Sequence, residues 1–141
     1  MRNTLVIILL SLVSGLAHAE GFKSKNETKV YAEKLMDHFV KTEFEKGLND
    51  AKKYWPIPEV EIDGMKNQIN LQWPIIDQRF GKPISKEFIK EKNIGESFVR
   101  YYFLQKFEKH SIYWQIDFYK ARELWKVNSI LFLDNLEPLF E

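Results

Sequence analysis

The chain has 141 residues, no cysteine and nearly balanced charge, with 21 lysine and arginine residues against 20 acidic ones. The absence of cysteine excludes disulfide bonds, a lipid-modified cysteine and a thiol active site in this sequence. The charges are interspersed and form no basic surface of the kind that binds nucleic acid or anionic lipid, so neither is expected as a partner.

The first 19 residues have the pattern of a secretory signal peptide. Arg2 supplies a positive charge, residues 5–13 form an apolar segment, and Ala17-His18-Ala19 matches an A-x-A cleavage site. The apolar segment is shorter than the roughly 20 residues that span a bilayer. We therefore expect cleavage after Ala19, export to the periplasm or out of the cell, and one mature domain over residues 20–141 without a membrane span.

Apolar residues in the first half of the mature chain recur with helical spacing. This spacing predicts a helix from Glu27, a bend near residues 41–45, and a second helix that ends at residues 56–58, where two prolines stand. A third helix is predicted over about residues 62–80, and Pro74 is expected to kink or restart it.

After residue 83 the apolar period changes from 3.6 to 2, which is the period of a β-strand. Four strands are predicted over residues 87–92, 97–108, 112–119 and 125–132, with the short connections of an antiparallel meander. The pattern indicates an α+β fold, in which about three N-terminal helices pack on the concave face of a four-stranded sheet.

A hairpin centred on Lys109-His110 would divide the side chains of the two middle strands between two faces. It pairs Tyr101 with Phe118 and places Phe103 and Trp114 on the same apolar face, which is expected to cover the helices. These four side chains are candidate ligand- or core-lining residues. They either fill the core or line a pocket for a small apolar ligand.

The same register pairs Tyr102 with Asp117 on the opposite face, near Arg100. Asp117 is the one acid inside the third predicted strand, and two interpretations are open. The carboxylate is either solvated or paired with Arg100, or it lies in a pocket, which requires that the polarity of the sheet be reversed.

Continuing the pairing into the last strand places Val127, Ser129 and Leu131 on the apolar face. A group of apolar side chains then remains on the opposite face and forms a predicted interface: Leu104, Tyr113, Ile130 and Phe132. Such a group indicates a partner or a covering segment. The alternatives are a partner bound to the sheet and the tail, residues 133–140, folded back over the cluster.

The order of elements and two sequence segments resemble the NTF2-like (cystatin-like cone) superfamily, and within it small exported bacterial proteins of uncharacterised function. The segments are Arg79-Phe80-Gly81-Lys82-Pro83 and the closing run from Phe118-Tyr119-Lys120 to Trp125-Lys126-Val127-Asn128-Ser129. The resemblance covers most of the mature chain. It implies the fold and a homodimer through the sheet. NTF2-like isomerases use a carboxylate base with a tyrosine donor, roles that would fall to Asp117 and Tyr102.

No catalytic motif is recognisable in the chain. There is no nucleophile elbow or phosphate-binding loop, and His38 and His110 lie on different predicted elements, so neither a metal site nor a cofactor is expected. We interpret the chain as an exported, non-catalytic binding or interaction module for an apolar ligand or an envelope protein. The alternatives are an isomerase- or lyase-like enzyme that uses a pocket carboxylate, and an inhibitor or accessory subunit of an envelope protein.

Overall fold

The computed structural model describes residues 20–141, so the predicted signal peptide lies outside the described residues. Helices come first in the chain: α1 (Lys25–Val40), α2 (Phe44–Ala51), the short 3-10 helix η1 (Lys52–Tyr54) and α3 (Glu59–Phe80). The strands β1 (Pro83–Ile94), β2 (Phe98–Phe107), β3 (Ser111–Lys120) and β4 (Trp125–Leu133) and the helical turn α4 (Glu137–Phe140) follow. The predicted α+β class is confirmed.

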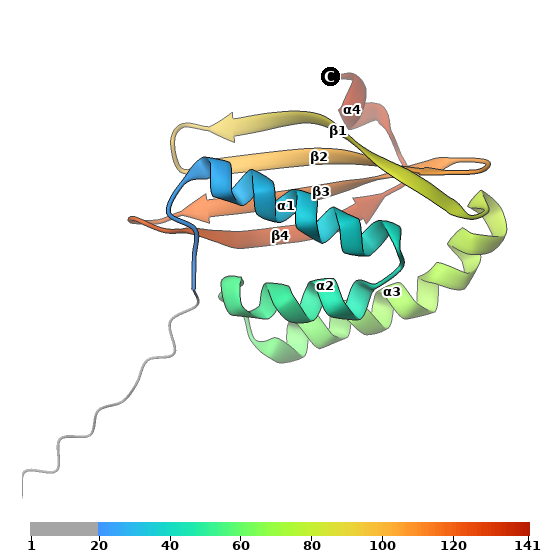
Figure 1. The fold of residues 1–141 in the computed structure, drawn as a ribbon, viewed down its shortest axis with the longest axis horizontal. Helices are drawn as coiled ribbons and strands as arrows, with labels where there is room; N and C mark the ends of the chain where they lie inside the picture. Colours follow the sequence, from blue (N-terminus) through green and yellow to red (C-terminus); the bar gives the residue numbers. More distant parts are fainter. Residues whose placement is uncertain (1–19) are drawn as a thin grey trace, which may run out of the picture.

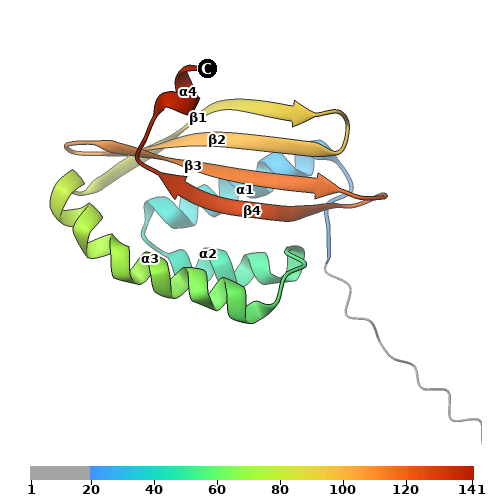
Figure 2. The same ribbon diagram turned by 180° about the vertical axis from the view of Figure 1, so that it is seen from behind.

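The four strands form one antiparallel sheet in the order β1-β2-β3-β4, and α1, α2 and α3 lie on one face of it (Figure 1). The chain after β4 crosses to the other face, where α4 lies near β1 (Figure 2). We call these the helix face and the outer face. Across residues 20–141, no helix combines the length and the apolar character that crossing a membrane requires.

Helix α1 begins two residues before the predicted start, because Ser24 caps it. The Ser24 hydroxyl accepts a hydrogen bond from the Glu27 N–H at 3.2 Å, and the Glu27 carboxylate accepts one from the Lys23 N–H at 2.8 Å. The bend predicted near residues 41–45 is confirmed by the break between α1 and α2. It contains Thr42, whose positive φ of 59° turns the chain.

Helix α3 is one continuous helix of 22 residues that contains Pro74, so the restart at Pro74 predicted as one alternative does not occur. The helix begins at Glu59, three residues earlier than predicted, directly after Pro58. Pro74 cannot bond the carbonyl of Asn70, but both residues are exposed, so water can satisfy that carbonyl.

The pairing of β2 with β3 is shifted by two residues from the predicted register. Arg100 lies opposite Asp117, and Phe103 lies opposite Trp114. The turn is centred on Glu108-Lys109 rather than Lys109-His110, because the Glu108 N–H donates to Lys82 O at 3.1 Å and the Lys109 N–H to Phe80 O at 2.9 Å. Since a two-residue shift keeps each side chain on its face, the predicted faces of β2 and β3 are confirmed.

A β-bulge in β4 overturns the prediction for the last strand. Phe118 pairs with Val127 and Asp117 pairs with Ser129, so Asn128 is the extra residue. One extra residue moves every later side chain to the opposite face. The predicted faces of four residues are therefore wrong: Ile130 and Phe132 lie on the helix face, and Ser129 and Leu131 lie on the outer face.

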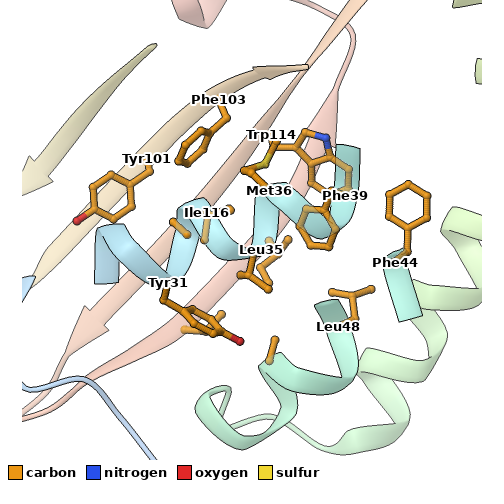
Figure 3. Packing of buried hydrophobic residues seen from close by; sticks show 14 of the residues in the cluster. Tyr31, Leu35, Met36, Phe39, Phe44, Leu48, Tyr101, Phe103, Trp114 and Ile116 are labelled. Carbon is orange, nitrogen blue, oxygen red and sulfur yellow. The ribbon is translucent and has the colours of Figure 1, made fainter. Parts of the chain in front are cut away.

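The predicted aromatic face fills the core between the sheet and α1 (Figure 3). The Trp114 ring stacks on Phe39 of α1 with centroids 4.3 Å apart, and Phe118 lies edge-on to Tyr101 at 5.9 Å. Each such buried ring contributes on the order of 2 to 3 kcal/mol to folding. A domain without disulfide bonds depends on this packing.

Candidate functional site

Strand β4 forms one edge of the sheet and carries no charged residue after Lys126. On the side of β4 that faces away from β3, only the first residue of the strand is paired within residues 20–141. Phe22 and Trp125 exchange two backbone hydrogen bonds of 2.8 Å there. Within the described chain, the backbone groups that residues 127–133 direct away from β3 have no hydrogen-bond partner. An unpaired and uncharged edge of this kind is a template for a further strand.

Strand β1, at the opposite edge, is protected. It carries five charged residues among twelve and has two register shifts against β2. Lys86 also anchors this edge to α1, with its amine 2.6 Å from Glu33 and 2.9 Å from Asp37. Charges and bulges are the devices by which natural sheets prevent strand addition. The contrast identifies β4 as the edge that is open to a partner.

An apolar groove runs between α3 and β4. One hollow of about 200 Å³ lies between Met65 and Ile69 of α3 and Ile130 of β4. A second hollow of about 300 Å³ continues it past Ile76. The two hollows share Gln72 and Phe132, and together they are called the α3–β4 groove.

The helix wall of this groove carries more apolar surface than the core requires. Ile75, which lines the second hollow, is 57% exposed, and Leu71, one turn earlier on α3 but outside the lining of either hollow, is 74% exposed. Contiguous exposed apolar residues are typical of a binding surface. The open edge of β4 and the apolar wall of α3 thus lie on two sides of one groove.

Asp117 and Tyr102, the candidate catalytic pair, lie on the outer face but are not opposite each other. Asp117 pairs with Arg100, whose Nε and Nη2 donate to the two carboxylate oxygens at 2.9 and 2.8 Å, whereas Tyr102 lies opposite Gln115. With its amide oxygen turned toward Arg100, Gln115 accepts from the same two nitrogens at 3.1 and 3.0 Å. The hydrogen bonds to Asp117 raise the pKa of Arg100. Both oxygens of the carboxylate are thus engaged in an ion pair, outside the helix-facing interior.

The predicted interface cluster is divided between the two faces. Leu104 and Tyr113 lie opposite each other on the outer face, while Ile130 and Phe132 are part of the helix-side packing. Tyr113 is only 1% exposed, and burial raises its pKa. It pairs with Leu133, the last residue of β4, after which the tail turns across this face (Figure 2).

The tail is held on the outer face by Lys90. The Lys90 amine donates to Pro138 O at 2.7 Å and lies 5.3 Å from the centre of the Tyr102 ring. The tail therefore lies on the outer face, although Ile130 and Phe132 of the cluster that it was expected to cover lie on the helix face. The tail occupies part of the surface where a homodimer was predicted.

The four predicted ligand- or core-lining residues separate into two groups. Trp114 lines the α3–β4 groove. Tyr101, Phe103 and Phe118 pack in the interior, where the Tyr101 hydroxyl bonds the Thr28 hydroxyl at 2.8 Å and the Phe103 ring lies 5.5 Å from Phe88. All three are buried members of the hydrophobic core of residues 20–141.

Sequence reasoning missed the groove, although one of its signals was visible. Residues 127–133 contain no charge, unlike β1, and this contrast could have identified the open edge.

As for metal binding, no group of three or more His, Asp or Glu in residues 20–141 is arranged to hold an ion.

Comparison with known proteins identifies no relative. No protein-family model matches the sequence, and neither the curated proteins nor the solved structures give a significant match.

Proposed function

We propose that the protein is an exported, non-catalytic interaction module of NTF2-like type that binds an extended segment of another polypeptide along β4. The observation that carries the proposal is the unpaired, uncharged edge of residues 127–133 beside an apolar groove. Export, inferred from the signal-peptide pattern, would make the partner an envelope or extracellular protein. The role would be that of an inhibitor or accessory subunit.

The chemistry of the edge favours a polypeptide over a lipid or another small molecule. Consecutive backbone N–H and C=O groups require a matching row of acceptors and donors, which an extended chain supplies at the same spacing. Alternate side chains of the added strand would then point toward the groove, where Met65 and Ile69 offer apolar contacts. The packing of Phe103 in the hydrophobic core, with no exposed surface, also favours an interaction module over a carrier.

A peptide selection tests this proposal. Random peptides of about 12 residues are selected on the mature chain, and the selected sequences are expected to alternate apolar residues without proline. Hydrogen exchange with the bound peptide should show slower exchange of amides in residues 127–133. Leu131→Lys, which places a charge on the edge strand, should weaken binding by about tenfold or more.

Ile84→Lys provides the matched control, because Ile84 is an exposed apolar residue on the opposite edge strand. This variant should bind the selected peptides as the wild type does. The proposal is wrong if the selection yields no peptide that protects residues 127–133, or if Leu131→Lys binds as tightly as Ile84→Lys.

A further inference from the structure

The α3–β4 groove continues into a third hollow, of about 430 Å³, beyond the end of β4. This hollow shares Arg79, Phe80 and Asp134 with the neighbouring hollow of about 300 Å³, so the three hollows follow one another along α3. Lys109 and His110, from the turn between β2 and β3, line its other wall. We call it the terminal hollow.

The turn that carries Lys109 and His110 is fixed against the end of α3 (Figure 2). The Lys109 N–H donates to Phe80 O at 2.9 Å, and the rings of Phe80 and His110 lie edge-on with their centroids 5.4 Å apart. Phe80 itself is buried, and its ring lies 5.7 Å from Phe107 of β2. The backbone of both walls of the terminal hollow is therefore held in place by the core.

The terminal hollow carries an excess of basic side chains. Arg79, Lys109 and His110 line it, and Asp134 is the only acid among the described residues that do so. No ion pair within residues 20–141 involves any of these four side chains. The basic groups are thus not neutralised by acids of the chain itself.

The opposite end of the groove is electrostatically balanced. Next to Met65, the Lys66 amine lies 2.9 Å from the carboxylate of Asp63, which also lies 2.9 Å from the amine of Lys52. Between the two ends the walls are uncharged, over residues 67–76 of α3 and 127–133 of β4. A ligand along the described groove would therefore meet an excess of charge at one end, and that charge is positive.

The end of α3 accounts for only one of these basic residues. A cation in the last turn of a helix offsets the partial negative charge of the helix C-terminus, and Arg79 lies there. Lys109 and His110 belong to a different part of the chain, the turn between β2 and β3. Basic side chains that converge on one hollow from two elements are complementary to an acidic group of a partner.

We propose that the polypeptide bound along β4 carries an aspartate or glutamate just before its paired stretch, and that this carboxylate enters the terminal hollow. The inference rests on the proposed function and names the chemistry of the partner. Strand β4 runs toward the hollow and ends at Leu133. An added strand that continues the antiparallel order of the sheet would run away from the hollow, so the acid lies on the N-terminal side of the bound segment.

The peptides selected on the mature chain test this inference. Sequences that protect residues 127–133 should carry Asp or Glu within about three residues before the apolar alternation begins. One selected sequence is then synthesised with Glu and with Gln at this position, with both ends of the peptide blocked. Calorimetry on the wild type should show the Glu peptide binding about fivefold more tightly, and the difference should fade in about 1 M NaCl.

Arg79→Gln combined with Lys109→Gln should bind the Glu and Gln peptides equally. Lys34→Gln combined with Lys41→Gln is the matched control, because it also removes two exposed basic residues but neither of them lines the groove or the terminal hollow. This control should keep the preference for the Glu peptide.

Two failures are distinguishable. Selected peptides without an acid at the stated position, or equal affinity of the wild type for the Glu and Gln peptides, would overturn the inference and leave strand addition intact. The absence of any peptide that protects residues 127–133 would overturn the proposed function and this inference together.

Discussion

Arg100 and Asp117 face each other across β2 and β3 on the outer face, joined by two hydrogen bonds of 2.9 and 2.8 Å. The pair is asymmetric: the Asp117 side chain is 7% exposed, whereas the Arg100 side chain is 43% exposed. Removal of the arginine would therefore leave a buried carboxylate without its cation, while removal of the acid would leave a guanidinium that still reaches water.

We expect Arg100→Met to destabilise the protein by about 2 kcal/mol at pH 7, a value reduced from that of a fully buried pair because Arg100 is partly exposed. Asp117→Asn, which leaves a guanidinium that reaches water, should cost less than Arg100→Met. Urea unfolding of both variants at pH 7 compares the two losses, and an equal or larger loss in Asp117→Asn would contradict the asymmetry.

Two helical glycines should respond in opposite ways to alanine. A Cβ at Gly64 in α3 would meet no atom within 4 Å, so Gly64→Ala should stabilise the protein by about 0.5 to 1 kcal/mol through helix propensity. A Cβ at Gly47 in α2 would lie 2.8 Å from the buried Phe39 ring, which itself stacks on Trp114. Gly47→Ala should destabilise by about 1 to 3 kcal/mol. Thermal unfolding compares the pair, and a shift of both variants in the same direction would argue against the packing of α2 on α1.

The Tyr31 hydroxyl donates to Asp50 Oδ2 at 2.8 Å, and burial together with this acid raises the pKa of Tyr31. Because the folded-state pKa lies above the unfolded value near 10, this contribution to stability is complete below pH 10 and is lost as the pH rises above it. The free energy of unfolding should therefore fall as the pH rises from about 10 to about 11. Tyr31→Phe should reduce that fall, whereas Tyr119→Phe, at an exposed position, should not. Identical pH profiles for Tyr31→Phe and the wild type would refute the assignment.

Truncation after Leu133 should uncover Tyr113. In the intact chain Tyr113 is buried on the outer face, next to the point where the tail turns, and burial raises its pKa. The shortened chain should therefore show nitration of Tyr113 by tetranitromethane and a pKa of Tyr113 closer to the ordinary tyrosine value. Tyr119 serves as the internal reference, since it is exposed and should react in both forms. An unreactive Tyr113 in the truncated chain would show that neighbouring strands, rather than the tail, cover it.

The sequence predicted the α+β class and the faces of β2 and β3, because a period of 2 is preserved when two strands slip by two residues. It did not predict the register, which depends on tertiary hydrogen bonds from Glu108 and Lys109 to Lys82 and to Phe80, the last residue of α3. Nor did it predict the bulge at Asn128, since one extra residue inside an apolar run leaves the alternation ambiguous.

The same bulge at Asn128 explains why the sequence did not predict the candidate site. Because the bulge turns Phe132 toward α3, the residue expected on an outer interface lies instead at the floor of the α3–β4 groove. The unprotected character of β4 could be inferred from its composition. The groove itself could not, because it depends on how far α3 lies from the strand.

The bridge between Phe22 and Trp125 has a consequence for any strand that pairs with β4. The N-terminal segment already occupies the first position on this edge, and the Glu20 N–H donates to Lys53 O at 2.7 Å, which leads the segment away from the sheet. An added strand could not extend its pairing beyond residue 127, because the N-terminal segment blocks the edge beside Lys126. Only residues 127–133, about 23 Å of strand, would be available for pairing. The N-terminal segment would therefore limit the length of a strand that pairs with β4. It would also fix the register of that strand, and so which residues of the added strand enter the groove.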